Sequence, residues 1–406
     1  MENKKKYIVV LGDGMSDLKD ESGKTPLMYA YKPYIDKLAG LGELGLCRTV
    51  PKGMKPGSDN ANLSVLGYDP LKYYTGRSPL EAVSMGIKLA DTDITYRCNL
   101  VTLSEDEPYN KKRMIDYSAG EITNDEAAAL IKYLSDNLGL PEQFDLYNGV
   151  SYRHCLVMHG GKVGAQHTPP HDISDKLITD YLPKGENAAL FLSFMEKSYA
   201  LLKDHPVNLD RKKRGLNPAN SMWLWGEGKK PVLTDFKQKF GKSGAMISAV
   251  DLLKGIAISA GMKVCDVPGA TGNINTDYEG KAAAAIDVLK GGCDFVYIHV
   301  EATDECGHHG DMEGKIKGIE YLDSRIVKPV CDALRAKGYD FSVLIMPDHA
   351  TPVKLKTHIS DPVPYLLYRS YDEKSGGAGA YNEDNCTASG NFEDEGYKLI
   401  LKLFSE

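Results

Sequence analysis

Acidic residues and histidines recur in this chain just after short apolar runs. They are Asp13, Asp304, His308, Asp348, His349 and His358. The runs are predicted to be buried strands, and in open α/β sheets functional groups gather beyond the carboxyl ends of the strands. Three carboxylates and three imidazoles at one such edge would suit Mn, Zn or Fe-type divalent ions. The spacing therefore predicts a binuclear metal site, of the kind that stabilises both the attacking and the leaving oxygen in phosphoryl transfer.

A loop rich in glycine and proline offers a nucleophile for such a site. Ser58 stands in the stretch Pro56-Gly57-Ser58-Asp59. The neighbouring glycine lets a ligand approach the backbone closely, and a metal ion can activate a hydroxyl by lowering its pKa. The alternative is that Ser58 only caps a helix that begins near Asp59. The two roles are compatible, because a helix N-terminus also favours a phosphate.

Alternating apolar runs and amphipathic segments must position these residues. Strands are predicted at 7–11, 293–300, 341–346 and 364–368, and helices at 33–41, 243–260, 279–290, 313–336 and 396–404. The last long helix carries Pro329, which predicts a bend or an interruption. Because strands and helices alternate, the predicted fold is α/β with a mainly parallel sheet.

The middle of the chain has a different sequence pattern. Between about 73 and 220, polar loops separate a predicted strand at 97–103 from helices at 124–137 and 186–202. A chain of 406 residues is also too long for one ordinary core. We therefore predict a metal-binding core in two parts, 1–72 and 221–406, and an inserted smaller α/β domain, 73–220, that covers the substrate.

Composition and charge exclude several classes of protein. Apolar residues make up 42% of the chain, too many for a mostly disordered protein, and the net charge of −7 disfavours nucleic acid or an anionic membrane as partner. The apolar run at 7–11 is too short for a signal peptide, and no run approaches a membrane span. Eight cysteines show no C-x-x-C pair and no disulfide framework. We expect a cytoplasmic protein with a small-molecule partner, and leave open whether it is a homo-oligomer.

Taken in order, these residues resemble the alkaline phosphatase superfamily, and within it the archaeal-type cofactor-independent phosphoglycerate mutases. The matching stretches are Leu11-Gly12-Asp13-Gly14-Met15, Pro56-Gly57-Ser58-Asp59, Leu66-Gly67-Tyr68-Asp69-Pro70, Asp304 with His308, Asp348-His349 and His358. The resemblance covers nearly the whole chain. It implies an alkaline phosphatase-like fold and a glycolytic isomerase that interconverts 3- and 2-phosphoglycerate without 2,3-bisphosphoglycerate as a cofactor.

The resemblance also implies which residues carry the reaction. One metal ion would be held by Asp304, His308 and His358, and the other by Asp13, Ser58, Asp348 and His349. Mn is the metal expected first, with Zn, Co and Mg as alternatives. Ser58 would take the phosphoryl group as phosphoserine and return it to a different hydroxyl of the small phosphorylated substrate.

Further roles follow from the same resemblance. Lys242 would stabilise phosphate charge, and the alternative is a solvated lysine at the start of a helix. Substrate binding is implied for Arg77, Arg97, Asn99, Arg113, Asp116 and His171, the last of which has a loop-capping role as an equal alternative.

The chain departs from the family pattern at three substrate cations. Tyr117, Glu121 and Trp225 stand where archaeal-type mutases carry arginine. Arginine binds phosphate and carboxylate through a fork of N–H groups that these side chains lack. Sequences with this pattern resemble a subgroup proposed to act as homoserine kinases in threonine biosynthesis, which is the alternative function. A non-catalytic sensor of phosphorylated metabolites is disfavoured, because a sensor needs no activated nucleophile.

Overall fold

The computed structural model describes residues 5–374 and 379–405, and the chain divides into two compact units. The core unit comprises Met1–Tyr74 and Leu233–Glu406, and the insert comprises Thr75–Val232. The insert therefore runs to Val232 instead of ending at 220 as predicted. The reason is that β9 (Ser221–Lys229) pairs along the length of β3 (Ile94–Leu103) and so belongs to the insert's sheet.

The core unit is built on a sheet of eight strands among the described residues. In spatial order they are β11 (Lys263–Val264), β10 (Gly244–Ile247), β12 (Phe295–Val300), β1 (Lys6–Gly12), β13 (Phe341–Met346), β14 (Val363–Arg369), β2 (Glu43–Cys47) and β15 (Phe392–Glu393). The strands from β11 to β13 are parallel, whereas β14 is antiparallel to both neighbours. The strands β1, β12 and β13 are buried along their whole length, as expected for parallel strands covered on both faces.

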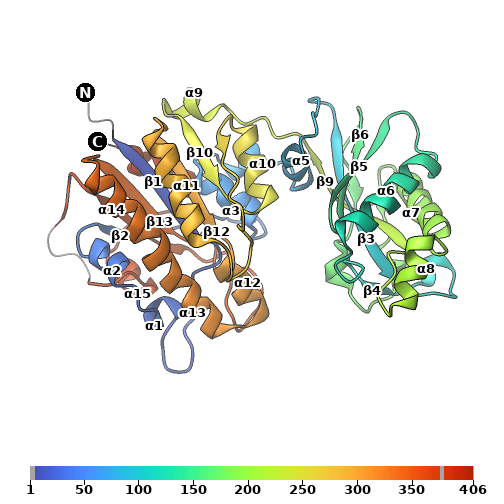
Figure 1. The fold of residues 1–406 in the computed structure, drawn as a ribbon, viewed down its shortest axis with the longest axis horizontal. Helices are drawn as coiled ribbons and strands as arrows, with labels where there is room; N and C mark the ends of the chain where they lie inside the picture. Colours follow the sequence, from blue (N-terminus) through green and yellow to red (C-terminus); the bar gives the residue numbers. More distant parts are fainter. Residues whose placement is uncertain (1–4, 375–378, 406) are drawn as a thin grey trace. The chain divides into compact units, whose positions relative to one another are not determined.

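Helices cover both faces of this sheet. They are α1 (Pro26–Tyr29), α2 (Pro33–Ala39), α3 (Ser58–Val65), α4 (Pro70–Tyr73), α9 (Phe236–Phe240), α10 (Asp251–Ser259), α11 (Tyr278–Lys290), α12 (Ala302–His309), α13 (Met312–Tyr321), α14 (Lys328–Ala336), α15 (Glu383–Ala388) and α16 (Leu399–Phe404). Figure 1 shows α11, α13 and α14 lying along one face. Alternate residues of β1 point to opposite faces. Ile8 and Val10 enter the apolar cluster beneath these helices, and Tyr7 contacts Phe404 of α16 on the other face.

Two helix predictions are corrected or refined. The segment predicted as one helix at 243–260 is the strand β10 followed by α10. The short run Gly244–Ile247 pairs with β12 in the sheet interior, so the gain from sheet pairing overrides its helical periodicity. The helix predicted at 313–336 is interrupted, as expected from Pro329, by a π-helical segment, Leu322–Val327, that joins α13 to α14.

The insert is built on an antiparallel sheet with helices packed against it. Its strands are β3, β4 (Met114–Asp116), β5 (Phe144–Val150), β6 (Arg153–Met158) and β9. Its main helices are α5 (Ser78–Ser84), α6 (Asn124–Asn137), α7 (Ala188–Leu202) and α8 (Pro206–Lys213). Apolar side chains of β3, α6 and α7 form one buried cluster, so the insert has its own core.

All eight cysteines are unpaired thiols, as their spacing predicted. Within the described residues, no helix combines the length and the apolar character that crossing a membrane requires.

Candidate metal centre

Loops at the carboxyl ends of three adjacent parallel strands bring the predicted ligands together. Asp13 follows β1, Asp348 and His349 follow β13, and α12 begins directly after β12. Asp304 and His308 lie four residues apart on α12, so they share one face of that helix. The loop that carries His358 is held beside them by a bridge between Ala350 and Ile359.

The first cluster consists of Asp304, His308 and His358, each of which offers a ligand atom within 4.8 Å of the others. The Nε2 atoms of His308 and His358 lie 2.9 Å apart. They lie 3.3 Å and 3.4 Å from the two carboxylate oxygens of Asp304. Two imidazole nitrogens and a carboxylate converging on one point form a donor set suited to a divalent ion.

The second cluster consists of Asp13, Asp348 and His349, all buried. The Nε2 atom of His349 lies 3.4 Å from Asp348 Oδ2 and 3.6 Å from Asp13 Oδ1. It also lies 3.1 Å from the hydroxyl oxygen of Ser58, the first residue of α3. Asp13 Oδ1 is buried and has no hydrogen-bond partner among the described residues. A buried carboxylate oxygen without a donor fits a cation as its partner.

Carboxylates are crowded around Asp13, and the direction of its pKa shift reflects this. Burial, followed by repulsion from Asp348, Asp304 and Glu301, raises the pKa of Asp13 well above its ordinary value. Burial would also raise the pKa of Asp304, but hydrogen bonds with His308 and His358 outweigh it and lower that pKa well below its usual range. The donor chemistry, the orphaned oxygen and the packed negative charge together fit two divalent ions.

Residues around the clusters hold the ligands in place, and these positioning roles were not predicted from the sequence. Asn62 donates to Asp348 Oδ2 at 2.8 Å, and the Thr351 hydroxyl donates to Asp304 Oδ1 at 2.5 Å. Gly14 has a φ of +61° and donates its N–H to Asp348 Oδ1 at 3.2 Å. An added Cβ at Gly14 would lie 2.6 Å from Asp304 Oδ1. Of these residues, Asn62 alone could have been found from the sequence, because it lies one helical turn after Ser58.

Lys242 does not lie in this centre, which corrects the prediction of its role. Its ammonium lies 4.5 Å from the ring centroid of Tyr7 and 5.4 Å from that of Phe404. Tyr7 is at the amino end of β1, whereas Asp13 follows the carboxyl end. Six residues of strand at about 3.3 Å each separate the two positions by about 20 Å. Lys242 therefore sits at the opposite edge of the sheet.

We expect Lys242→Ala to leave turnover within about twofold of wild type, because the substitution removes only a cation–π contact of about 1 kcal/mol or less. Steady-state kinetics and a thermal melt of the same preparation check this. A drop in kcat of more than about tenfold with an unchanged melt would contradict the placement of Lys242 away from the centre.

Four of the predicted substrate residues gather around Trp225 within the insert. Arg77 and Arg97 share the carboxylate of Glu81 at 2.7 Å and 2.8 Å. The Arg97 guanidinium lies 4.1 Å from the Trp225 ring centroid. Asn99 accepts a hydrogen bond from the Trp225 indole N–H at 2.9 Å, and the His171 ring is 5.3 Å from the Trp225 ring.

The other two predicted substrate residues have different partners. The Arg113 guanidinium donates to the carbonyl of Asp175. Asp116 accepts hydrogen bonds from Ser118, Gly120 and Asn217. Burial would raise the pKa of Asp116, but these bonds lower it. Among the described residues, neither side chain has a contact that joins it to the group around Trp225, and Asp116 organises a turn.

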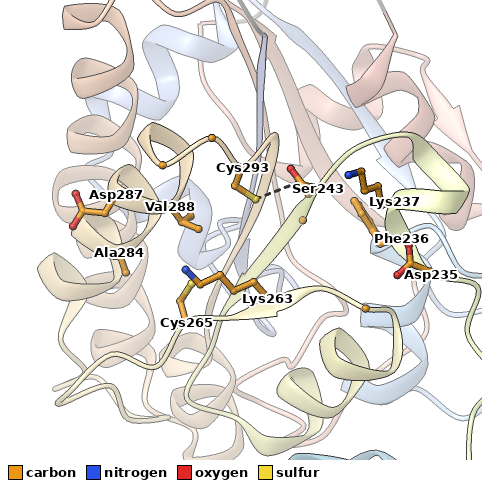
Figure 2. A pocket seen from close by; sticks show the side chains of 14 residues that line it. Asp235, Phe236, Lys237, Ser243, Lys263, Cys265, Ala284, Asp287, Val288 and Cys293 are labelled. Atoms are coloured by element: carbon orange, nitrogen blue, oxygen red, sulfur yellow. Dashed lines mark hydrogen bonds between the residues drawn. The ribbon is translucent and has the colours of Figure 1, made fainter.

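A cavity of about 700 Å³ lies in the core unit but away from the metal ligands. Figure 2 shows Lys237, Ser243, Lys263 and Cys293 around it. Ser243 and Cys293 precede β10 and β12, so the cavity opens mainly at the amino edge of the sheet. The metal ligands follow the carboxyl ends, and the cavity is therefore not part of the candidate centre.

We expect metal affinity at the Asp304 cluster to fall as the pH is lowered from about 8 to about 6. The hydrogen bond that His308 donates to Asp304 outweighs burial and raises the pKa of His308, and a histidine binds a metal only as the neutral imidazole. Each pH unit below that pKa should cost about tenfold in affinity for one competing proton. Calorimetric titration with MnCl2 measures this. His309→Gln, at the neighbouring exposed histidine, should keep the same profile, and equal affinity at both pH values would contradict the expectation.

The mainly parallel core, with its polar site at the carboxyl edge of the sheet, places the chain among α/β enzymes. The family model for 2,3-bisphosphoglycerate-independent phosphoglycerate mutase matches residues 39–208. A mutase of that name from Methanosarcina barkeri is 48% identical over 94% of each chain. A probable mutase of that name from Geobacter sulfurreducens is 47% identical over 97% of this chain and 98% of its own.

Solved structures agree on the architecture. A protein from Pyrococcus horikoshii superposes with a TM-score of 0.81 at 27% identity, over 99% of this chain and 97% of its own. A cofactor-independent phosphoglycerate mutase from Thermoplasma acidophilum has a TM-score of 0.64 at 24% identity, over 98% and 99%, and indicates the fold alone. The chain belongs to the family of 2,3-bisphosphoglycerate-independent phosphoglycerate mutases. This confirms the resemblance found in the sequence and the predicted α/β fold with an inserted smaller unit.

Proposed function

We propose that this chain interconverts 3-phosphoglycerate and 2-phosphoglycerate through a phosphoserine on Ser58. The observation that carries the proposal is the position of the Ser58 hydroxyl. Ser58 is the first residue of α3. Its hydroxyl oxygen lies 3.1 Å from His349 Nε2, beside the buried carboxylates of the second cluster. A hydroxyl in that position has both an activating environment and a helix N-terminus to favour the phosphoryl oxygens.

Two divalent ions would complete the centre. Asp304, His308 and His358 would hold one, and Asp13, Ser58, Asp348 and His349 would hold the other. When bound, they would lower the pKa of the hydroxyl and neutralise charge on the phosphoryl oxygens. Mn is the ion we propose first, with Zn, Co or Mg as alternatives, and no 2,3-bisphosphoglycerate would be needed.

The chain's own residues would then carry the transfer in two half-reactions. In the first, the Ser58 oxygen forms a bond to phosphorus, the P–O bond to the substrate breaks, and the glycerate oxygen that leaves takes up the proton that Ser58 gives up. In the second, the other glycerate hydroxyl forms a bond to phosphorus, the bond between phosphorus and the Ser58 oxygen breaks, and the proton that this hydroxyl loses returns to Ser58. Because donor and acceptor are the same molecule, no other phosphate donor is required.

We propose that the insert supplies substrate-binding cations from the group around Trp225. Arg97 is buried, and burial lowers its pKa to about 10, so it remains charged at neutral pH. Its stacking on Trp225 and its ion pair with Glu81 fix the guanidinium plane. A fixed guanidinium suits the planar carboxylate of a glycerate.

One observation favours the second candidate, a homoserine kinase-like phosphotransferase. At two positions where the family pattern has arginine, this chain brings aromatic rings to the same group. Trp225 lies against Arg97, and Tyr117 has its ring 6.1 Å from that of His171. Fewer cations would suit a less anionic substrate, such as the hydroxyl-bearing amino acid homoserine.

The two candidates are separated by paired assays on protein loaded in turn with Mn, Zn, Co and Mg. One assay follows 2-phosphoglycerate formed from 3-phosphoglycerate, and the other follows phosphohomoserine formed from homoserine and ATP. We expect turnover in the first. Turnover only in the second would replace the mutase proposal with the kinase.

A further inference from the structure

A fully buried histidine lies directly behind the second cluster. His299 is on β12 and is 0% exposed. Its Nε2 lies 2.9 Å from Asp13 Oδ2, and its Nδ1 lies 3.1 Å from the Ser248 hydroxyl oxygen. His299 is none of the predicted metal ligands, yet it contacts one of them with a ring nitrogen that is buried from water.

The hydrogen bonds around Ser248 favour one tautomer of His299. The N–H of Val250 donates to the Ser248 oxygen at 3.0 Å, so the hydroxyl accepts there and has its own proton to give. Directed at His299, that proton makes Nδ1 an acceptor and places the ring proton on Nε2. Nε2 then donates to Asp13 Oδ2. A chain of hydrogen bonds therefore runs from the Val250 N–H through the Ser248 hydroxyl and the His299 ring to the Asp13 carboxylate.

This chain of hydrogen bonds leaves the two oxygens of Asp13 in different environments. Oδ2 accepts a hydrogen bond from the neutral ring of His299, while Oδ1 is buried without a hydrogen-bond partner among the described residues. Oδ1 is also the oxygen nearer His349 Nε2, at 3.6 Å. The backbone of Asp13 is held separately, because the Thr303 hydroxyl donates to its carbonyl at 2.5 Å. The hydrogen bond from His299 therefore controls the rotation of the carboxylate alone.

We infer that His299, held in one tautomer by Ser248, is a positioning residue that turns Asp13 Oδ1 toward the metal ion of the second cluster. The inference rests on the proposed metal centre, and it deepens that proposal by naming what orients one ligand. Hydrogen-bonding partners of metal ligands typically change metal affinity by about 10- to 100-fold when they are removed.

Metal titration of the full chain without substrate tests the inference. MnCl2 is titrated calorimetrically into wild type, His299→Leu, His299→Gln and Ser248→Ala. We expect His299→Leu to weaken one of two Mn sites by about 10- to 100-fold and to leave the other unchanged. His299→Gln should restore affinity to within about threefold, because its amide N–H can reach Asp13, and Ser248→Ala should fall between the two.

A matched control separates positioning from simple packing. Ser342 is a buried serine on β13 of the same sheet, bonded to Tyr371. Ser342→Ala removes a hydroxyl of the same size near the amino edge, and it should leave both Mn affinities unchanged. Circular dichroism and a thermal melt show whether each variant is folded. If His299→Leu does not fold, the test is the comparison of the Mn affinities of Ser248→Ala and Ser342→Ala.

Folded variants at His299 and Ser248 with wild-type affinity at both sites would overturn the inference and make His299 a packing residue. Wild type that binds no Mn would overturn both the inference and the metal centre. Wild type that binds Mn but does not convert phosphoglycerate would refute the proposed function and leave the inference on His299 standing.

Discussion

Ser58→Ala should reduce turnover by about 10⁴-fold or more, because the substitution removes the atom proposed to form the bond to phosphorus. The fold should survive, since the Ser58 side chain does not cap α3: the preceding Gly57 holds the N-cap position. Metal content should change little, because the two carboxylates and the imidazole of the second cluster remain. The measurement is conversion of 3-phosphoglycerate by metal-loaded protein, together with metal content by mass spectrometry.

Ser64→Ala is the matched control for this experiment. Ser64 is a buried serine of the same helix, and no hydrogen bond of its side chain to the cluster is found within residues 5–374 and 379–405. Turnover of Ser64→Ala should stay within a few-fold of wild type. Residual activity of Ser58→Ala above about one per cent would rule out phosphoserine as an obligatory intermediate.

Asp304→Asn should remove the metal ion of the first cluster. Asp304 supplies the negative charge of that cluster and lies within 3.4 Å of both imidazoles. An amide cannot supply this charge, so metal content after dialysis should fall from about two ions per chain to about one. Turnover should fall by more than about 100-fold, because loss of a ligand should cost more than the roughly 10- to 100-fold typical for loss of a residue that only hydrogen-bonds to a ligand.

The neighbouring acid offers the control for Asp304. Glu305→Gln removes one negative charge from the same turn of α12 but none from the cluster. It should retain about two ions per chain. Unchanged metal content in Asp304→Asn would remove this carboxylate from the ligand set and with it the proposed first site.

Several elements could be predicted from local sequence. The strand at 341–346 and the helix at 124–137 have the predicted bounds in the structure. Each is a short apolar run or an amphipathic segment between clear breakers, so the neighbouring residues decide its conformation. The prediction of one helix at 243–260 was wrong for the opposite reason. Its apolar residues fit a helix locally, and only pairing with β12 makes Gly244–Ile247 a strand.

The pairing of β10 also decides where Lys242 lies, whose predicted role came from the family resemblance. If 243–260 were a helix, Lys242 would be free to lie at either edge of the sheet. Once β10 begins at Gly244 and runs parallel to β12, the residue before it must lie at the amino edge. The position of a cation relative to the metal ligands therefore depended on tertiary pairing.

The sequence by itself determined the types of the ligands and their place after buried strands, because a carboxylate or imidazole at a strand end is visible in local pattern. Only the tertiary structure decided how these ligands are oriented. Asn62 reaches Asp348 and His299 reaches Asp13 across 286 residues of chain in each case. Hydrogen bonds between such distant segments follow from the order of strands in the sheet, and no local pattern encodes that order.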